Sequence, residues 1–212
     1  MMHEDHLGNR GLLEPGGVQW MTAGRGIIHS EMPQQDAGLM RGFQLWVNLP
    51  AAEKMQPASY QDLPASAITE NRLAGGGLVR LIAGGLDIAG RSVTGPVSGK
   101  TTDILYADLH LGKDEICDLA VPGHLNAMLY VYEGKIGTEG REHQSQLTAG
   151  HLGRLGEGNS ISLRAAGTGA RVLLMAGKPL REPIVQYGPF VMNSREEIEQ
   201  ALRDFRSGRL AS

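Results

Sequence analysis

The stretch Ile104-Leu105-Tyr106-Ala107-Asp108-Leu109-His110-Leu111 shows most clearly which fold class this chain adopts. Its odd-numbered positions are apolar, and Tyr106, Asp108 and His110 lie between them. Because successive side chains of a β-strand point to opposite faces, the alternation predicts a strand with one buried and one polar face.

Similar short segments lie on both sides of this stretch, and most of them end near Gly or Pro. They are Phe43–Leu49, Leu78–Ala83, Ala127–Tyr132 and Arg171–Ala176. Many short strands separated by turn residues are typical of an all-β sandwich or barrel. The 30 glycines among 212 residues fit such a turn-rich chain.

Two stretches depart from the strand pattern. Pro50–Asn71 is polar and contains proline, which predicts a long surface connection. Asn193–Arg206 has apolar residues at helical spacing, and Ser194 with Glu197 forms a capping box. Gly208 can end this helix. We expect the helix to pack on a sheet rather than to bind a partner.

Composition narrows the class of protein. A net charge of -3 gives no support for direct binding to nucleic acid or to a membrane. The single cysteine, Cys117, excludes an intramolecular disulfide and predicts a buried structural thiol in a reducing compartment. No apolar run is long enough for a transmembrane helix, and the first residues do not resemble a signal peptide. A cytoplasmic location is expected, or also a nuclear one in a eukaryote.

A faint internal repeat links the two halves of the chain. Leu13–Gly24 and Leu147–Gly158 share a leucine, a glycine, an aliphatic residue and a closing glycine at one offset. Two copies of one β unit would give two similar barrels, although chance similarity between Gly-rich turns is the alternative. The same offset places His29 opposite Leu163 and Glu31 opposite Ala165, so the second copy would lack polar ligands.

His29 and Glu31 are the candidate metal ligands. They lie two positions apart, so on a strand their side chains point to the same face. One imidazole and one carboxylate form half of a typical non-haem iron or manganese site. No His-x-His pair precedes them in the chain, so the other half of such a site is missing from the sequence.

Four stretches make the chain resemble the pirin family of bicupins. They are Gly17–Pro33, Leu45–Leu49, Gly177–Pro183 and Gln186–Asn193. The resemblance implies an all-β fold of two jelly-roll-like cupin β-barrels, the first incomplete, plus one C-terminal α-helix. It places a partial N-terminal cupin at residues 1–95, a C-terminal cupin without metal ligands at 96–192, and the helix and tail at 193–212.

The resemblance also implies a cofactor and an activity. The family holds one divalent metal, usually iron, with other first-row metals as alternatives, through a His-x-His pair, a third His and a Glu. His29 and Glu31 match the third His and the Glu. Flavonol (quercetin) 2,3-dioxygenase activity is the implied oxidoreductase function, with Glu31 as ligand or catalytic base. Trp20, Met21, Phe43 and Leu45 are candidates for a pocket that binds the small aromatic substrate, although plain core positions explain each of them too.

Two further readings stay open at this point. The resemblance also implies an iron-dependent transcriptional or metabolic cofactor that binds a protein partner without catalysis. Alternatively, the form at hand is impaired, because the family's His-x-His segment falls before Met1; a truncated gene, a mis-called start or a true short form would each explain this. In that case we expect weak iron binding and a tendency to aggregate, whereas the full-length protein is expected to be a monomer.

The other histidines are not expected to complete the site. His3 and His6 are three residues apart, which does not put them on one strand face, and a chain terminus is a poor platform for ligands. The remaining histidines, in the second half, are expected to be exposed or structural. They are His110, His124, His143 and His151.

Overall fold

The computed structural model describes residues 1–99, 101–139 and 144–210, which divide into two compact units. Unit 1 comprises Met1–Ser66 and Leu180–Ser212, and unit 2 comprises Ala67–Pro179. Residues 67–95 thus belong to the second unit and the C-terminal helix belongs to the first. The boundaries of the two compact units therefore differ from the predicted domain ranges 1–95 and 96–192. Those ranges stay a prediction about the two cupin domains.

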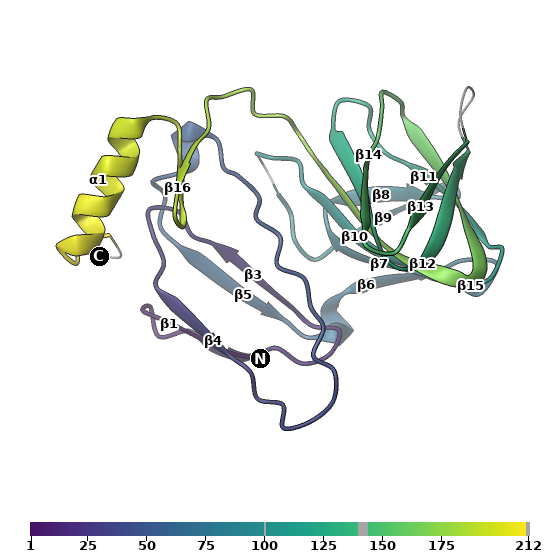
Figure 1. Ribbon diagram of the computed structural model, residues 1–212, viewed down its shortest axis with the longest axis horizontal. Helices are drawn as coiled ribbons and strands as arrows, with labels where there is room; N and C mark the ends of the chain where they lie inside the picture. The colour runs from purple at the N-terminus through teal and green to yellow at the C-terminus, as the bar shows by residue number, and fades with distance from the viewer. Residues whose placement is uncertain (100, 140–143, 211–212) are drawn as a thin grey trace. The chain divides into compact units, whose positions relative to one another are not determined.

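Unit 2 is a ten-stranded sheet that curves into a nearly closed barrel (Figure 1). Strands pair in the order β6-β7-β10-β15-β11-β8-β9, and β12 pairs with β13, β14 and β15. The strands are β6 (Thr69–Arg72), β7 (Leu78–Ala83), β8 (Gly85–Ile88), β9 (Arg91–Thr94), β10 (Leu105–Leu111), β11 (Ile116–Ala120), β12 (Asn126–Glu139), β13 (Gln144–Thr148), β14 (His151–Arg154) and β15 (Ser160–Gly177).

The core of unit 2 lies inside this curved sheet. Leu105, Ala107, Leu109 and Leu111 are buried on one face of β10, as their alternation predicts, while Asp108 and His110 lie on the other. The long strand β15 pairs with β10, β11 and β12, and it contributes Leu163, Val172 and Leu174 to the same core. Cys117 is buried there as expected, and burial raises the pKa of its thiol to about 12.

Unit 1 is built from small sheets and the helix. Strands β2-β1-β4 form one sheet, β3 pairs with β5, and β16 pairs with β17. The elements are β1 (Met2–Asp5), β2 (Arg10–Leu12), β3 (Val18–Thr22), β4 (His29–Met32), the 3-10 helix η1 (Ala51–Glu53), β5 (Ser59–Leu63), the 3-10 helix η2 (Ala65–Ala67) that ends just beyond the unit boundary, β16 (Val185–Tyr187), β17 (Phe190–Met192) and α1 (Arg195–Arg206).

The C-terminal helix begins and ends as the sequence predicts. The Ser194 side chain accepts a hydrogen bond from the Glu197 backbone N–H, and the Glu197 carboxylate accepts one from the Ser194 N–H. Ile198 and Ala201 are buried, and the helix contacts β16 and β17. It therefore packs on a hairpin, which confirms the expected structural role.

Two expectations about residues 43–71 are wrong. Phe43–Leu49 is not a strand: no described strand pairs with it, and Trp46 is 59% exposed. Alternation suits a strand, but a strand forms only where a neighbour satisfies its backbone N–H and C=O groups. The stretch 50–71 is more than a surface connection, because it holds η1, β5, η2 and the start of β6.

The two turns that the sequence offset aligns have the same backbone conformation. Gly16 and Gly150, which the offset aligns, have φ angles of 80° and 84°, a left-handed conformation that glycine adopts without strain. Each turn leads into a strand, β3 in the first copy and β14 in the second. Leu163 and Ala165, opposite His29 and Glu31, are fully buried core residues on β15. The positions that the offset sets opposite the candidate ligands are therefore apolar core positions, and the repeat itself stays a prediction.

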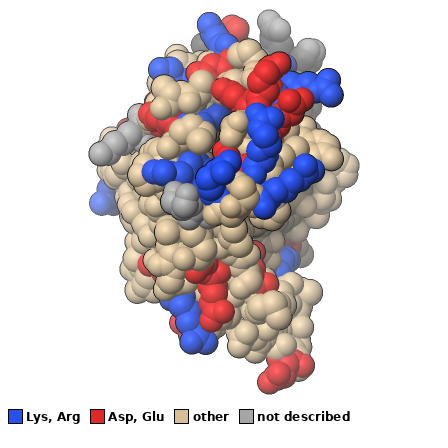
Figure 2. Space-filling model, turned by 90° about the vertical axis from the view of Figure 1, so that its left-hand side faces the viewer, with Lys and Arg blue, Asp and Glu red and all other residues tan. Residues whose placement is uncertain are grey.

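Surface charge agrees with the near-neutral composition. The face in Figure 2 carries Lys and Arg side chains as well as Asp and Glu side chains, and uncharged surface covers much of the remainder. Within the described residues, no helix is long and apolar enough to span a membrane.

Candidate metal centre

The register of β1 against β4 creates the candidate site. The strands pair antiparallel, with His3 opposite Glu31 and Asp5 opposite His29. Directly opposed residues of antiparallel strands have neighbouring side chains on one face of the sheet. Two residues of β1 and two of β4 therefore share one face, although the two pairs are far apart in sequence.

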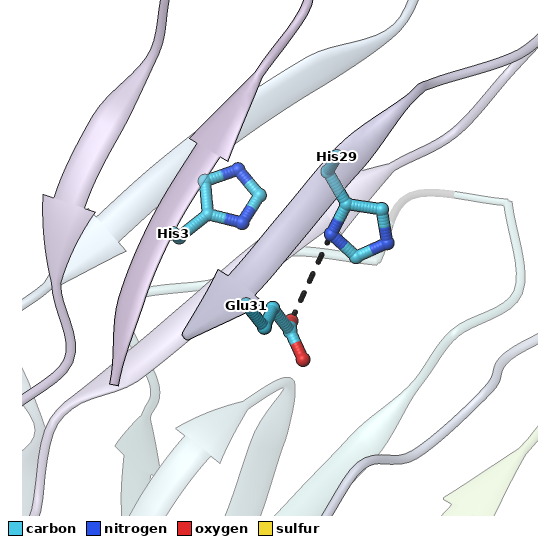
Figure 3. A group of neighbouring side chains, drawn as sticks. All are labelled: His3, His29 and Glu31. Atoms are coloured by element: carbon cyan, nitrogen blue, oxygen red, sulfur yellow. Dashed lines mark ion pairs between the residues drawn. The ribbon is translucent and has the colours of Figure 1, made fainter. Parts of the chain in front are cut away.

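Three of these side chains form a group that could hold a metal ion. Ligand atoms of His3, His29 and Glu31 all lie within 4.8 Å of one another. His29 Nδ1 lies 3.8 Å from Glu31 Oε1 (Figure 3). His3 reaches the group from the neighbouring strand, while His29 and Glu31 come from the same strand, as their spacing predicts (Figure 3).

His3 is fully buried, and neither of its ring nitrogens makes a hydrogen bond. Its Nε2 lies 3.5 Å from Asp5 Oδ2, an ion-pair distance too long for a good hydrogen bond. Buried polar atoms are nearly always satisfied in folded proteins, and an exception calls for an explanation such as a missing ion. An imidazole with unpartnered nitrogens beside His29 and Glu31 fits a metal ligand.

Asp5 and Tyr60 hold His3 in place. The Tyr60 ring stacks on the His3 ring with centroids 4.5 Å apart and an interplanar angle of 9°. Burial raises the pKa of Tyr60, and the charges of Asp62 and Asp5 raise it further. Burial alone would raise the pKa of Asp5, but hydrogen bonds from Asn9, the contact with His3 and a hydrogen bond from the Leu7 N–H keep it lowered. Asp5 therefore presents a carboxylate toward His3.

The position of His3 is the main departure from the sequence-based expectation. The three-residue spacing between His3 and His6 argued against both as metal ligands. However, β1 pairs with β4, and this pairing brings His3 into the group without His6. His6 instead accepts a hydrogen bond from the Ile28 N–H at its Nδ1. The signal that could have revealed His3 is the Met2–Asp5 strand followed by a Gly-containing turn, which places a hairpin at the start of the chain.

The other predicted site residues lie in different settings. Trp20 and Met21 are half-buried on β3, whereas Phe43 and Leu45 lie on an exposed segment without secondary structure. Their role as a substrate pocket stays a prediction. His110 contacts Asp108, His124 contacts Asp103, His151 contacts Thr148, and His143 lies outside the described residues.

The strand architecture and the curved sheet of unit 2 are those of a cupin protein. A family model described as "Pirin" matches residues 1–47, and one described as "Pirin C-terminal cupin domain" matches residues 106–211. The chain belongs to the pirin family.

Individual relatives agree with this assignment. The chain is 56% identical, over 211 residues, to a Pseudomonas aeruginosa protein named "Putative quercetin 2,3-dioxygenase", covering 100% of this chain and 73% of that one. It is 37% identical over 210 residues to human Pirin, covering 99% and 70%. A crystal structure of quercetin 2,3-dioxygenase from Acinetobacter baumannii superposes with a TM-score of 0.83 at 33% identity, over 100% of this chain and 72% of that one.

Proposed function

We propose that this chain binds one divalent metal ion, with iron as the expected metal, through His3, His29 and Glu31. The observation that carries the proposal is the orphaned, fully buried imidazole of His3 beside two other ligand-type side chains. Two imidazoles and one carboxylate with open positions are the donor set of non-haem iron oxygenases. His3 departs from the ligand set that the family resemblance implies.

We further propose that the metal centre serves a flavonol 2,3-dioxygenase-type oxidation. The names of the bacterial relatives and of the Acinetobacter structure support this substrate class. When bound, the metal would supply a Lewis acid that favours the ionised hydroxyl of a flavonol. Glu31 is partly exposed at the edge of the group, so it can accept the hydroxyl proton that ionisation releases.

A second candidate function is binding of a protein partner without catalysis. Several large apolar side chains between residues 39 and 47 are exposed to solvent. Exposed apolar side chains that lie together often mark a site of protein–protein interaction. The exposed side chains of this segment include Leu39 at 83%, Met40 at 47% and Trp46 at 59%. This function predicts metal-dependent capture of a partner and no oxygen consumption with a flavonol.

Metal titration of the purified chain tests the first proposal. Wild-type protein is titrated anaerobically with Fe²⁺, and aerobically with Co²⁺ as a spectroscopic substitute. We expect one ion per chain, and His3→Ala, His29→Ala and Glu31→Gln should each weaken binding by about a hundredfold or more. His124→Ala, a change in unit 2, should leave the affinity unchanged.

The outcomes separate the parts of the proposal. Loss of binding in His29→Ala but not in His3→Ala would remove His3 from the ligand set. If all variants bind alike, the site is wrong. Oxygen uptake with quercetin by the iron-loaded wild type, absent in His29→Ala, tests the dioxygenase function. A metal-loaded chain that consumes no oxygen would contradict that function while leaving the metal site intact.

A further inference from the structure

Unit 2 contains a second polar cluster, outside the candidate metal centre. Asp108 and His110 lie on the face of β10 away from the core, and Tyr132 lies on β12. His110 Nε2 is 2.9 Å from Asp108 Oδ2, the Tyr132 hydroxyl donates to Asp108 Oδ1 at 2.7 Å, and the same hydroxyl is 3.3 Å from His110 Nε2.

This network fixes which ring nitrogen of His110 carries the proton. An ionised carboxylate only accepts hydrogen bonds, so Nε2 of His110 must donate to Asp108. In the neutral ring Nδ1 is then an acceptor. Within the described residues Nδ1 has no hydrogen-bond partner. His110 can therefore offer a lone pair to a ligand that donates a proton.

His110 lines a surface cavity of about 430 Å³, a volume within the range of small-molecule sites. Thr168, Arg171 and Glu133 line it as well. Arg171 is directly opposite His110 on one side and Glu133 on the other in the strand register. The Arg171 guanidinium, the Thr168 hydroxyl and the His110 acceptor thus line the same cavity.

Much of the cavity wall consists of glycines, whose lack of side chains leaves space for the cavity. Those that line it are Gly76, Gly77, Gly112, Gly134 and Gly169. The buried Glu115 carboxylate accepts hydrogen bonds from the Gly77 and Gly112 N–H groups, at 3.1 and 2.7 Å. A Cβ on Gly77 would come within 2.3 Å of that carboxylate. The wall is therefore backbone held in place by a buried side chain.

We infer that this cavity binds a small carboxylate that also carries a hydroxyl group. The planar guanidinium of Arg171 matches a carboxylate, and the ligand hydroxyl would donate to His110 Nδ1. Arg171 Nε is 3.5 Å from Glu133 Oε2, but both side chains are about half exposed, at 44% and 55%. Such an exposed ion pair is weak. Arg171 also hydrogen-bonds to Tyr132, but a guanidinium has five N–H donors, so donors remain for an incoming anion.

NMR titration of the full chain with glycolate, acetate and inorganic phosphate tests this inference. Glycolate should bind in the millimolar range and shift signals of residues that line the cavity. Acetate, which lacks the hydroxyl, should bind about threefold or more weakly. Arg171→Gln should weaken glycolate binding about tenfold, whereas the control Arg91→Gln, on β9, should not.

Two further variants test the hydroxyl contact and the competing charge separately. His110→Phe should bind glycolate no better than acetate. Glu133→Gln should bind glycolate about two- to fivefold more tightly, because it removes a competing negative charge. The inference is overturned if glycolate shifts no cavity signals, if Arg171→Gln and Arg91→Gln bind it alike, or if phosphate binds as tightly as glycolate.

Discussion

At the scale of single residues, His3 is the most informative side chain. An imidazole buried without hydrogen bonds costs free energy in the absence of a ligand, because water no longer satisfies its nitrogens. His3 is fully buried, both its nitrogens lack partners, and Tyr60 stacks on its ring. We therefore expect His3 to lower the stability of the metal-free protein, as is typical of residues at functional sites.

His3→Leu should therefore have effects of opposite sign with and without metal. In metal-free buffer the variant should be more stable than wild type by about 1–3 kcal/mol, since it removes two unsatisfied buried nitrogens. With excess Co²⁺ the wild type should gain stability by ligand binding, and the variant should gain little. Thermal unfolding of both proteins in chelator and in Co²⁺ measures this. A variant that is less stable in chelator would contradict the account of His3 as an orphaned ligand.

At the scale of elements, the capping box of α1 shows how local sequence sets a boundary. The Glu197 carboxylate accepts hydrogen bonds from the backbone N–H groups of Ser194 and Asn193, at 3.1 and 2.8 Å. Lys54 lies nearby in the same unit; it is buried, and its Nζ donates to Asn48 and to the Val191 carbonyl. Burial lowers the pKa of Lys54, and Glu182 and Glu197 oppose this effect. The helix start is thus tied to its surroundings by hydrogen bonds and charge.

Ser194→Ala should reduce the stability of unit 1 by about 1 kcal/mol, because the Glu197 N–H loses its acceptor. Glu199→Ala is the matched control on the same helix. It removes only an exposed contact with Arg195, at 3.8 Å, and should cost less than about 0.5 kcal/mol. Urea unfolding followed by circular dichroism compares the two. Equal losses would show that the cap does not set the stability of this helix.

At the scale of the whole molecule, buried acidic groups of unit 2 set its response to alkaline pH. Burial raises the pKa of the Cys117 thiol from 9.0 to about 12 and that of Tyr106 from 10.0 to about 12. Between these values each group stays protonated in the folded chain and ionises in the unfolded chain. The unfolded state then binds fewer protons, so stability must fall as pH rises.

The free energy of unfolding should fall above pH 9, by up to about 1.4 kcal/mol per pH unit for each such group. Cys117→Ala should make this decline shallower, whatever its effect at neutral pH.

Alkylation of Cys117 by iodoacetamide at pH 8 should follow the unfolding of unit 2 rather than the fast rate of an exposed thiol. Rapid labelling of the folded chain would show that the thiol is accessible after all.

The sequence by itself determined those features whose causes are local. The apolar alternation of Ile104–Leu111 predicted β10, the capping residues predicted the start of α1, and the two-residue spacing put His29 and Glu31 on one strand face. Each depends on backbone geometry within a few residues, which a sequence pattern reports directly.

Tertiary structure alone decided the rest. His3 joins His29 and Glu31 only because β1 pairs with β4 in one register, and a shift by one residue would turn His3 to the other face. Phe43–Leu49 has the alternation of a strand but no described partner strand, and so it stays outside any sheet. Pairing joins residues that are distant in sequence, and local spacing carries no information about which strand becomes the neighbour.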